Sequence, residues 1–566
     1  MEYKWNIKEL PARADMEEMM GRLQVPWTVA VLLLQRGIHS FEEAKDFFRP
    51  DLNALHDPYL MADMDKAVER ILKAVANNER ILVYGDYDVD GTTSVALMSS
   101  FLRKKHPKIE TYIPDRYNEG YGVSEKGIHW AYEHGVDLII TLDCGIKAKD
   151  KIALANKMGI DVIVCDHHNP GNDLPPALAV LDPKRPDCDY PYKELCGCGV
   201  GFKLAQALAA EWDMPFDTLD EYLDLVALAI GADIVPITGE NRILAFHGLR
   251  RINEDPRPGI KACLEVASVK KVLSISDVVF KIAPRINAAG RIEHGKLAVE
   301  LLCSESMEHA LTIAEQVNEH NRTRQDLDKS ITAQAIQMIE DSGEQNRKST
   351  VLYHPEWHKG VIGIVASRLI ENYYRPTIVF TESKGVLSGS ARSVRGYDLY
   401  SALEQCADIL EQFGGHMYAA GMTLLPERFP EFKERFEEVV SNTITPDQLV
   451  PKMDIDMIVP LNEITPKFFR IIQQFAPFGP GNMTPVLASL AVSDTGYSRA
   501  VGETLDHLKL TVRDSSGAQL HGIAFGMGGN ERLVKSGNPI SIAYHLDENE
   551  WNGQTSIQLM VRDMKA

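Results

Sequence analysis

Short apolar runs alternate with helix-like segments over residues 70–235. The runs cover residues 81–84, 136–142, 161–165 and 177–181, and helical periodicity lies between them over 92–105 and 147–158. Such alternation is typical of an open, mostly parallel sheet covered by helices. Each run stops at a carboxylate or a histidine, and α/β sheets bind ligands beyond the carboxyl ends of their strands. The pattern therefore predicts an α/β domain with a functional site at one sheet edge.

The rest of the chain follows other patterns. Residues 1–65 have a polar, helical pattern and carry no recognisable chemistry. Residues 303–341 lack glycine and proline and repeat apolar positions every three or four residues, which predicts one long helix. This helix either bridges two lobes or lies on the surface with a kink. Glycine-rich turns mark a second α/β unit at about 350–425, and evenly spaced short strands after about 450 suit a small barrel or sandwich.

Composition limits the class of protein. The 566 residues are 45% hydrophobic and 25% charged, which is ordinary for a globular protein. No apolar run approaches the roughly 20 residues of a membrane span, and the first residues lack a signal-peptide core, so we expect no membrane partner. The eight cysteines contain no CxxC pair. Cys188, Cys196 and Cys198 are explained by small-residue packing or by a metal, and a reducing, cytoplasmic location is expected.

The net charge is −20, which argues against a general polyanion binder because cations supply most nucleic-acid affinity. A local basic groove is still compatible with this charge. Carboxylates gathered around metals would also add to the negative total.

Three carboxylates at alternate positions follow the first apolar run. Asp86, Asp88 and Asp90 lie in GDYDVDG, and a Gly-Thr-Thr-Ser segment then leads into a helix. Carboxylates this close repel one another, and they ionise together only if cations hold them. An acidic surface loop is the alternative, but such loops seldom follow an apolar strand directly. We therefore expect this turn to bind metal.

Three further segment ends carry candidate ligands. Asp143 in TLDCG ends the second run, although aspartate is also common in turns. Asp166, His167 and His168 in CDHHNP follow the third run, and this mixture of carboxylate and imidazole suits Mn, Zn or Fe better than Ca or Mg alone. Asp233 in GADIVP follows a helix of small residues.

These ligands can converge at one sheet edge. The set is large enough for two metals roughly 3.5–4 Å apart, an arrangement that clamps the attacking and leaving oxygens of a phosphoryl group. The convergent set is Asp88, Asp90, Asp143, His167 and Asp233. We expect Asp86, Asp166 and His168 to be further ligands, orienting residues or phosphate contacts.

The four motifs resemble those of the DHH phosphoesterase superfamily, named after the triplet at 166–168. Residues 281–291 (KIAPRINAAGR) are similar to the arginine-rich segment of the RecJ-type single-strand exonucleases. Residues 354–366 (HPEWHKGVIGIVA), 389–393 (GSARS) and 414–416 (GGH) resemble the DHHA1 domain of that family. Residues 475–482 (FAPFGPGN) resemble its entrance to a C-terminal OB-fold, so the likeness spans about residues 60–566.

The resemblance implies an α/β fold class with five parts. A parallel-sheet DHH catalytic domain (66–300) is linked by a long helix (301–345) to a smaller α/β DHHA1 substrate-binding domain (346–445). An OB-like β-barrel for nucleic-acid binding (446–566) follows, and a helical extension (1–65) precedes the catalytic domain.

The activity implied is a 5′-to-3′ exonuclease on single-stranded DNA that uses two Mn²⁺ or Mg²⁺ ions and releases 5′-mononucleotides. The family acts in DNA repair and recombination, and a helicase and a single-strand-binding protein are conceivable partners. The expected catalytic residues are Asp143, Asp166, His167 and His168, and the expected metal ligands are Asp86, Asp88, Asp90, Asp143, His167 and Asp233. The expected phosphate and nucleic-acid contacts are Arg285, Asn287, Arg291, Arg392, Ser393, Gly415 and His416.

Two other functions fit part of the pattern. A DHH phosphodiesterase for short oligonucleotides or cyclic dinucleotides would resemble residues 75–425, but such enzymes generally lack the N-terminal extension and the OB-like tail. A non-catalytic DHH-like replication scaffold would keep the fold and lose metal carboxylates. All five convergent ligands are present here, which disfavours the scaffold.

Overall fold

The computed structural model describes residues 2–269, 271–551 and 553–566. The chain forms two compact units, each built from two separate segments. One unit combines residues 2–8 with residues 322–455. The other combines residues 9–321 with residues 456–566.

The second of these units contains a five-stranded parallel sheet in the order β3-β2-β4-β5-β6. Its strands are β2 (Ile81–Gly85), β3 (Ile109–Tyr112), β4 (Leu138–Leu142), β5 (Asp161–Cys165) and β6 (Ala179–Leu181). The four predicted strands are confirmed, and β3 was missed. The strand order reverses between β2 and β4, and α/β sheets bind ligands at this kind of position.

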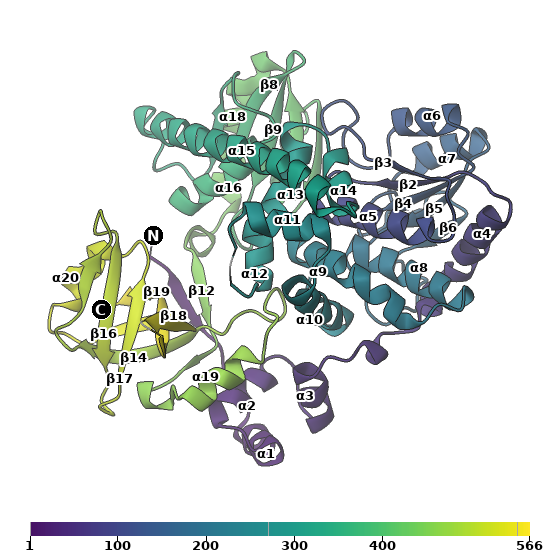
Figure 1. Ribbon diagram of the computed structural model, residues 1–566. Helices are drawn as coiled ribbons and strands as arrows, with labels where there is room; N and C mark the ends of the chain where they lie inside the picture. The colour runs from purple at the N-terminus through teal and green to yellow at the C-terminus, as the bar shows by residue number, and fades with distance from the viewer. Residues whose placement is uncertain (1, 270, 552) are drawn as a thin grey trace. The chain divides into compact units, whose positions relative to one another are not determined.

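Helices cover both faces of the sheet (Figure 1). Alternate side chains of each strand enter two different cores. Ile81 and Val83 pack with α4 (Met64–Ala76), α5 (Val89–Arg103) and α8 (Gly197–Glu211), whereas Leu82 and Tyr84 pack with α6 (Glu125–Glu133) and α7 (Lys149–Lys157). The inner strands β2, β4 and β5 are therefore almost continuously apolar, as is typical of parallel strands with two covered faces.

A helical segment follows the sheet. It contains α9 (Leu223–Ala232), α10 (Gly239–Glu254), α11 (Pro258–Val266), α12 (Ile275–Asp277), a π-helical turn (Val278–Ile282), α13 (Ala283–Ile292) and α14 (Lys296–Leu302). The predicted long helix is confirmed as α15 (Met307–Asp341), which is 35 residues long. It belongs to one unit up to Asn321 and to the other from Arg322 onwards.

The unit that contains residues 322–455 has a mixed sheet in the order β10-β11-β9-β8-β7. Its strands are β7 (Thr350–Tyr353), β8 (Thr377–Ser383), β9 (Val386–Arg392), β10 (Gln412–His416) and β11 (Ala419–Leu424), and its helices are α16 (Ile362–Tyr373), α17 (Leu399–Glu404) and α18 (Phe429–Thr443). The predicted second α/β unit is thus confirmed. A separate parallel pair joins β1 (Lys4–Ile7) to β12 (Lys452–Ile455).

The C-terminal segment forms a barrel, as the short strands predicted. Its strands are β13 (Met457–Ile458), β14 (Leu487–Asp494), β15 (Arg499–Val501), β16 (His507–Arg513), β17 (Gln519–Ala524), β18 (Ile540–Trp551) and β19 (Gln554–Lys565). Pairing runs β14-β18-β19-β17-β16 and closes from β16 back to β14. A closed five-stranded barrel of this kind is the framework of the OB-fold.

The N-terminal segment differs from expectation. The predicted helical character is confirmed by α1 (Arg13–Leu23), α2 (Trp27–Leu34) and α3 (Phe41–Phe48), but the segment begins with strand β1 and its helix α2 is not polar. Residues 28–34 of α2 are all buried, and Val29–Leu34 belong to the same core as the barrel residues Leu508 and Tyr544. The reason is the sequence TVAVLLL, because a helix that is apolar all round must be enclosed.

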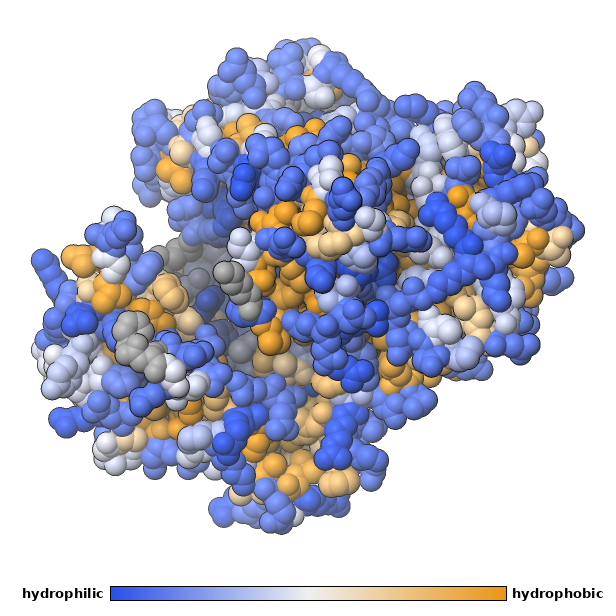
Figure 2. All heavy atoms as spheres, in the orientation of Figure 1, coloured by the Kyte–Doolittle hydropathy of each residue, from blue (hydrophilic) through white to orange (hydrophobic). Residues whose placement is uncertain are grey.

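The surface seen in Figure 2 is mostly hydrophilic, and its apolar residues form separate patches. None of the helices that the structure describes combines the length and the apolar character that a bilayer crossing requires.

Candidate metal centre

Four neighbouring strands are each followed at once by an aspartate. Gly85, Leu142, Cys165 and Leu181 lie level in the sheet register, so Asp86, Asp143, Asp166 and Asp182 emerge along one edge. Parallel pairing explains this arrangement, because it places all the carboxyl ends on the same side. The edge predicted from the sequence is therefore present.

The first acidic turn leads directly into helix α5. Asp88 is the N-cap of that helix, and its carboxylate accepts a hydrogen bond from the Gly91 amide at 3.1 Å. Asp90 lies in the first turn, and its two oxygens accept from the amides of Gly197 (2.6 Å) and Cys198 (2.7 Å) at the start of α8. Helix N-termini stabilise carboxylates in this way.

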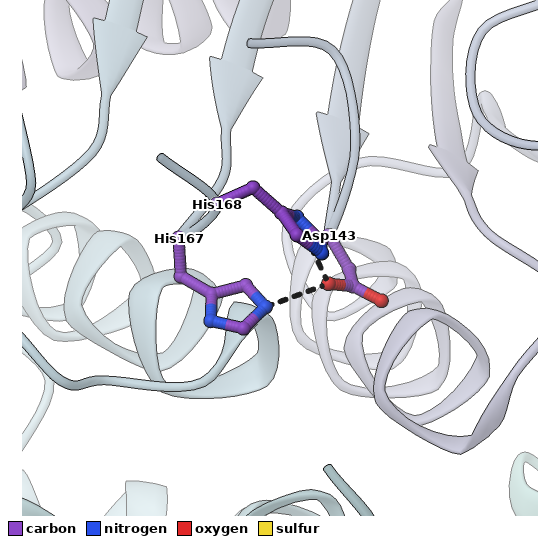
Figure 3. A group of neighbouring side chains, drawn as sticks. All are labelled: Asp143, His167 and His168. Carbon is purple, nitrogen blue, oxygen red and sulfur yellow. Dashed lines mark hydrogen bonds and ion pairs between the residues drawn. The ribbon is translucent and has the colours of Figure 1, made fainter. Parts of the chain in front are cut away.

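His167 lies at the centre of the cluster. Its Nε2 is 3.1 Å from Asp143 Oδ1, 3.7 Å from Asp90 Oδ2 and 3.6 Å from Asp233 Oδ2. Two overlapping groups could each hold a metal ion, one formed by Asp143, His167 and His168 and the other by Asp90, His167 and Asp233. Figure 3 shows the first group, in which both imidazoles approach the Asp143 carboxylate.

Close backbone approach makes this convergence feasible. A Cβ atom added to Gly197 would lie only 2.6 Å from the Cβ of Asp143, so the start of α8 can approach this side chain only as glycine. Asp143 itself has a φ of 59°, a left-handed conformation that few non-glycine residues adopt. Strained backbone of this kind gathers at functional sites.

The electrostatics indicate a site that needs positive charge. Burial and neighbouring carboxylates raise the pKa values of Asp86, Asp90 and Asp143 well above their ordinary range, and burial raises that of Asp233 to about 7. A divalent cation would stabilise the charged carboxylates against both the burial and the mutual repulsion that produce these shifts. Burial lowers the pKa of His167 to about 3, so its ring is neutral, as a metal-binding imidazole must be.

Unused buried atoms fit the same interpretation. Asp86 Oδ2 and His167 Nδ1 are buried and have no hydrogen-bond partner within the described part of the chain. Carboxylate oxygens together with imidazole nitrogen form a donor set that suits Mn²⁺ and also accepts Mg²⁺. The residues present therefore fit two divalent ions.

Asp166 differs from the other carboxylates. Its Oδ1 accepts from the amides of His167 and His168 and from His168 Nδ1 at 2.7 Å, and its Oδ2 accepts from the Ile146 amide. These bonds use its acceptor capacity and orient the His168 ring. Despite opposing desolvation, the hydrogen bond and the charge of Asp166 raise the pKa of His168 to about 9.

The arginine-rich segment forms α13 and contacts the acidic turn. A Cβ on Gly290 would lie 2.8 Å from the carbonyl oxygen of Tyr87, which shows how closely the helix approaches. Arg285 donates to Asn318 Oδ1 at 3.0 Å, and Arg285, Asn287 and Arg291 are all partly exposed.

The other predicted phosphate contacts belong to the unit that contains residues 322–455. Arg392 on β9 and His416 on β10 both pair with Ala419 of the strand between them, so they occupy one row of the sheet. Gly415 has a φ of 153°, and a Cβ there would lie 2.3 Å from the Ala419 carbonyl oxygen. Ser393 donates its hydroxyl to the Tyr397 carbonyl at 2.8 Å.

Two residues at the metal edge were missed from the sequence. The Tyr121 hydroxyl is 3.3 Å from both His168 Nε2 and the carbonyl oxygen of Asp143, and the residue is 56% exposed. The sequence feature that could have pointed to Tyr121 is the pair of glycines beside it, Gly120 and Gly122. Asp182 ends the fourth apolar run, and burial raises its pKa to about 7. Asp182 could have been identified in the same way as the other aspartates, because it directly follows an apolar run.

Family models match three parts of the chain. The DHH family, N-terminal domain, matches residues 80–230, the DHHA1 domain matches 346–442, and the RecJ OB domain matches 455–563. The fold and the acidic edge thus define a protein of the DHH/DHHA1 class with an OB domain.

Full-length relatives narrow this class. The single-stranded-DNA-specific exonuclease RecJ of Bacillus subtilis is 39% identical over 99% of this chain and 70% of its own length. RecJ of Escherichia coli is 35% identical over 95% of this chain and 96% of its own length. The chain belongs to the RecJ family of single-stranded-DNA-specific exonucleases.

Solved structures agree with this assignment. The crystal structure of RecJ from Thermus thermophilus in complex with Mn²⁺ has a TM-score of 0.86 and 29% identity, and the alignment covers 100% of this chain and 80% of that one. A crystal structure of exonuclease RecJ bound to manganese has a TM-score of 0.61 and 34% identity, covering 71% of this chain and 99% of that one.

Proposed function

We propose that this chain is a Mn²⁺- or Mg²⁺-dependent exonuclease that degrades single-stranded DNA in repair and recombination. Its reactive centre is the acidic edge of the parallel sheet. The observation that carries the proposal is the convergence of Asp90, Asp143 and Asp233 on the neutral His167 ring. Family membership supports the substrate, and manganese- and magnesium-bound relatives support the ions.

The proposed ion ligands surround His167. Asp90, Asp143, His167 and Asp233 would hold the ions, and Asp86 and Asp88 would add carboxylate oxygens from the first acidic turn. When bound, two such ions supply a water acidic enough to attack phosphorus, and they neutralise charge on the leaving oxygen.

Asp166 and His168 act beside the ions. Asp166 holds His168 by its Nδ1, which favours the protonated ring and directs Nε2 towards the Tyr121 hydroxyl. A protonated Nε2 can donate to a non-bridging phosphate oxygen, where negative charge develops during displacement.

The DNA strand requires contacts beyond the metal edge. Arg285, Asn287 and Arg291 on α13 suit phosphates near the acidic turn, and Arg392 with His416, Ser393 and Gly415 offers a second phosphate site, because Arg binds phosphate with a bidentate fork. The barrel presents exposed Phe525 together with exposed Arg499 and Lys509, which pair across β15 and β16. Aromatic and basic side chains of this kind bind single strands by stacking and charge.

The finer features of this proposal go beyond the names of the relatives and rest on the motif resemblance alone. Degradation proceeds from the 5′ end and releases 5′-mononucleotides in the cytoplasm, and a helicase and a single-strand-binding protein supply and present the strand.

The test uses single-stranded DNA labelled separately at each end, in Mn²⁺, with duplex and cyclic-dinucleotide controls. We expect early release of the 5′ label as a mononucleotide, with no release from duplex. Asp143→Ala should lose at least about 100-fold in rate, because it removes a metal ligand. Asp173→Ala, which removes an exposed carboxylate paired with Lys149, should retain the parental rate.

Three results would overturn parts of the proposal. Turnover by Asp143→Ala at the parental rate would refute the metal centre. Hydrolysis of the cyclic dinucleotide with an intact polymer would refute the polymer substrate and leave the metal centre standing. No turnover of any substrate in Mn²⁺ or Mg²⁺ would favour a scaffold role.

A further inference from the structure

We propose that the proline-glycine turn before the barrel, residues 475–482, positions Asp233 for metal binding. The turn thereby makes the metal centre depend on the C-terminal domain. The inference relies on the proposed function only in taking Asp233 as a metal ligand. Residues 475–482 act through the backbone and are positioning residues.

The segment after Asp233 is short and strained. Asp233 caps the end of α9, and α10 begins at Gly239, so residues 234–238 connect Asp233 to α10. Ile234 has a φ of 59° and is 63% exposed. A β-branched residue adopts this conformation rarely, and it persists only where the surroundings hold the backbone in place.

The proline-glycine turn contacts this segment directly. The Ile237 amide donates to the Pro480 carbonyl oxygen at 2.7 Å. A Cβ on Gly479 would lie 2.5 Å from Ile237 Cγ1, and a Cβ on Gly481 would lie 2.9 Å from Thr238 Cγ2. The turn is therefore packed against the Asp233 segment at a distance that only glycine permits.

Buried polar groups hold the turn in place. Arg242 on α10 is 5% exposed, and its guanidinium donates to the carbonyl oxygens of Phe475 (2.9 Å) and Ala476 (3.1 Å) and to that of Phe47 (2.8 Å). Asn482 donates to the Phe475 and Pro477 carbonyls, and its own oxygen accepts from Arg36. Helix α10, which follows the Asp233 segment, therefore also holds the proline-glycine turn in place through Arg242.

The opposite side of the segment is also held. The Pro236 carbonyl accepts from the Tyr192 hydroxyl at 3.2 Å and from Asn241 Nδ2 at 3.0 Å. Asp233 is therefore fixed at one end by α9 and at the other by a segment clamped between the catalytic domain and the turn. A shift of the turn would move the carboxylate relative to His167, and groups that orient ligands typically change metal affinity by about 10–100-fold.

The test is direct Mn²⁺ binding by titration calorimetry on the full chain without DNA. Gly479→Ala should weaken Mn²⁺ binding by about 10-fold or more. Gly529→Ala in the barrel is the matched control, because no atom lies within 4 Å of the added Cβ, and it should bind as the parent does. Asp233→Asn should weaken binding in the same titration.

A compensating variant separates positioning from general damage. Ile237→Ala removes the Cγ1 and Cδ1 atoms and leaves Cβ 3.7 Å from the new methyl group, an ordinary contact. Gly479→Ala/Ile237→Ala should therefore bind Mn²⁺ more tightly than Gly479→Ala alone. Binding no tighter than that of the single variant would overturn the proposal.

Hydrogen exchange on the unmodified chain gives a second measurement that needs no variant to fold. Mn²⁺ should slow exchange of the Ile237 amide and of the Gly479, Gly481 and Asn482 amides together, because coupling acts in both directions. Slower exchange at Ile237 without any change in the turn would overturn the proposal, as would parental Mn²⁺ affinity in folded Gly479→Ala. Parental affinity in Asp233→Asn would instead refute Asp233 as a ligand, and the positioning role with it.

Discussion

Asp233→Asn should stabilise the metal-free protein, although it damages the metal centre. Burial raises the pKa of Asp233 to about 7, whereas an unfolded aspartate has a pKa of about 3.9. At about 1.36 kcal/mol for each pKa unit, ionised Asp233 destabilises the metal-free fold by at most about 4 kcal/mol at pH 8. The side chain is 30% exposed, so solvent screening reduces this to about 2 kcal/mol.

The size and the sign of the stability change caused by Asp233→Asn depend on pH and on bound metal. Below the unfolded pKa the group is neutral in both states and costs nothing, and the cost grows as pH rises from about 4 to about 7. The gain from Asp233→Asn at pH 5 should therefore be about one-third of the gain at pH 8. In Mn²⁺ the parent should be the more stable of the two proteins. Metal binding stabilises it by about 2.7 kcal/mol when the free Mn²⁺ concentration is 100 times the dissociation constant.

The assay is thermal unfolding of both proteins in EDTA and in Mn²⁺. For a unit of this size, 2 kcal/mol corresponds to an increase in Tm of about 2 °C in EDTA at pH 8. Tyr132→Ala, a change at an exposed ring away from the acidic edge, serves as the control. A Tm below that of the parent in EDTA, or an equal gain at pH 5 and pH 8, would refute the electrostatic reasoning.

Three further variants test separate contacts. Asp166→Asn weakens the hold on His168 and should lower kcat by about 10–100-fold with an unchanged fold, measured by single-strand degradation and circular dichroism. Arg242→Met leaves several buried carbonyls unpaired and should cost about 3 kcal/mol, seen as a lower Tm; an unchanged Tm would contradict its structural role. Phe525→Ala should weaken single-strand binding by about 10-fold in fluorescence anisotropy, whereas equal affinity would exclude stacking on this ring.

The catalytic sheet was largely predictable because its strands are buried on both faces. Residues 81–84 and 161–165 are almost continuously apolar, and such runs are easy to recognise. Strand β3 was missed because Ile109–Tyr112 is an edge strand with polar positions. The burial of helix α2 was not predicted because its packing partners, such as Phe475, lie more than 400 residues away in the sequence.

The site was predictable at the level of residue type and strand position. The sequence could not separate Asp166 from Asp143, since their difference depends on which oxygens are already hydrogen-bonded. Tyr121 reaches His168 only through the course of the loop before α6, and the pattern of polar and apolar residues does not encode that course. The contact between Ile237 and Pro480 joins two loops, which have no periodicity to recognise.

The enclosure of α2 by the barrel core has a practical consequence for dissecting the protein. A fragment designed on the matched OB segment, residues 455–563, would omit Val29–Leu34, although these side chains complete its hydrophobic core. Such a fragment would expose an apolar face to water and tend to aggregate. A fragment that joins residues 9–48 to residues 456–566 through an engineered linker would retain that core and is the better choice for isolated expression.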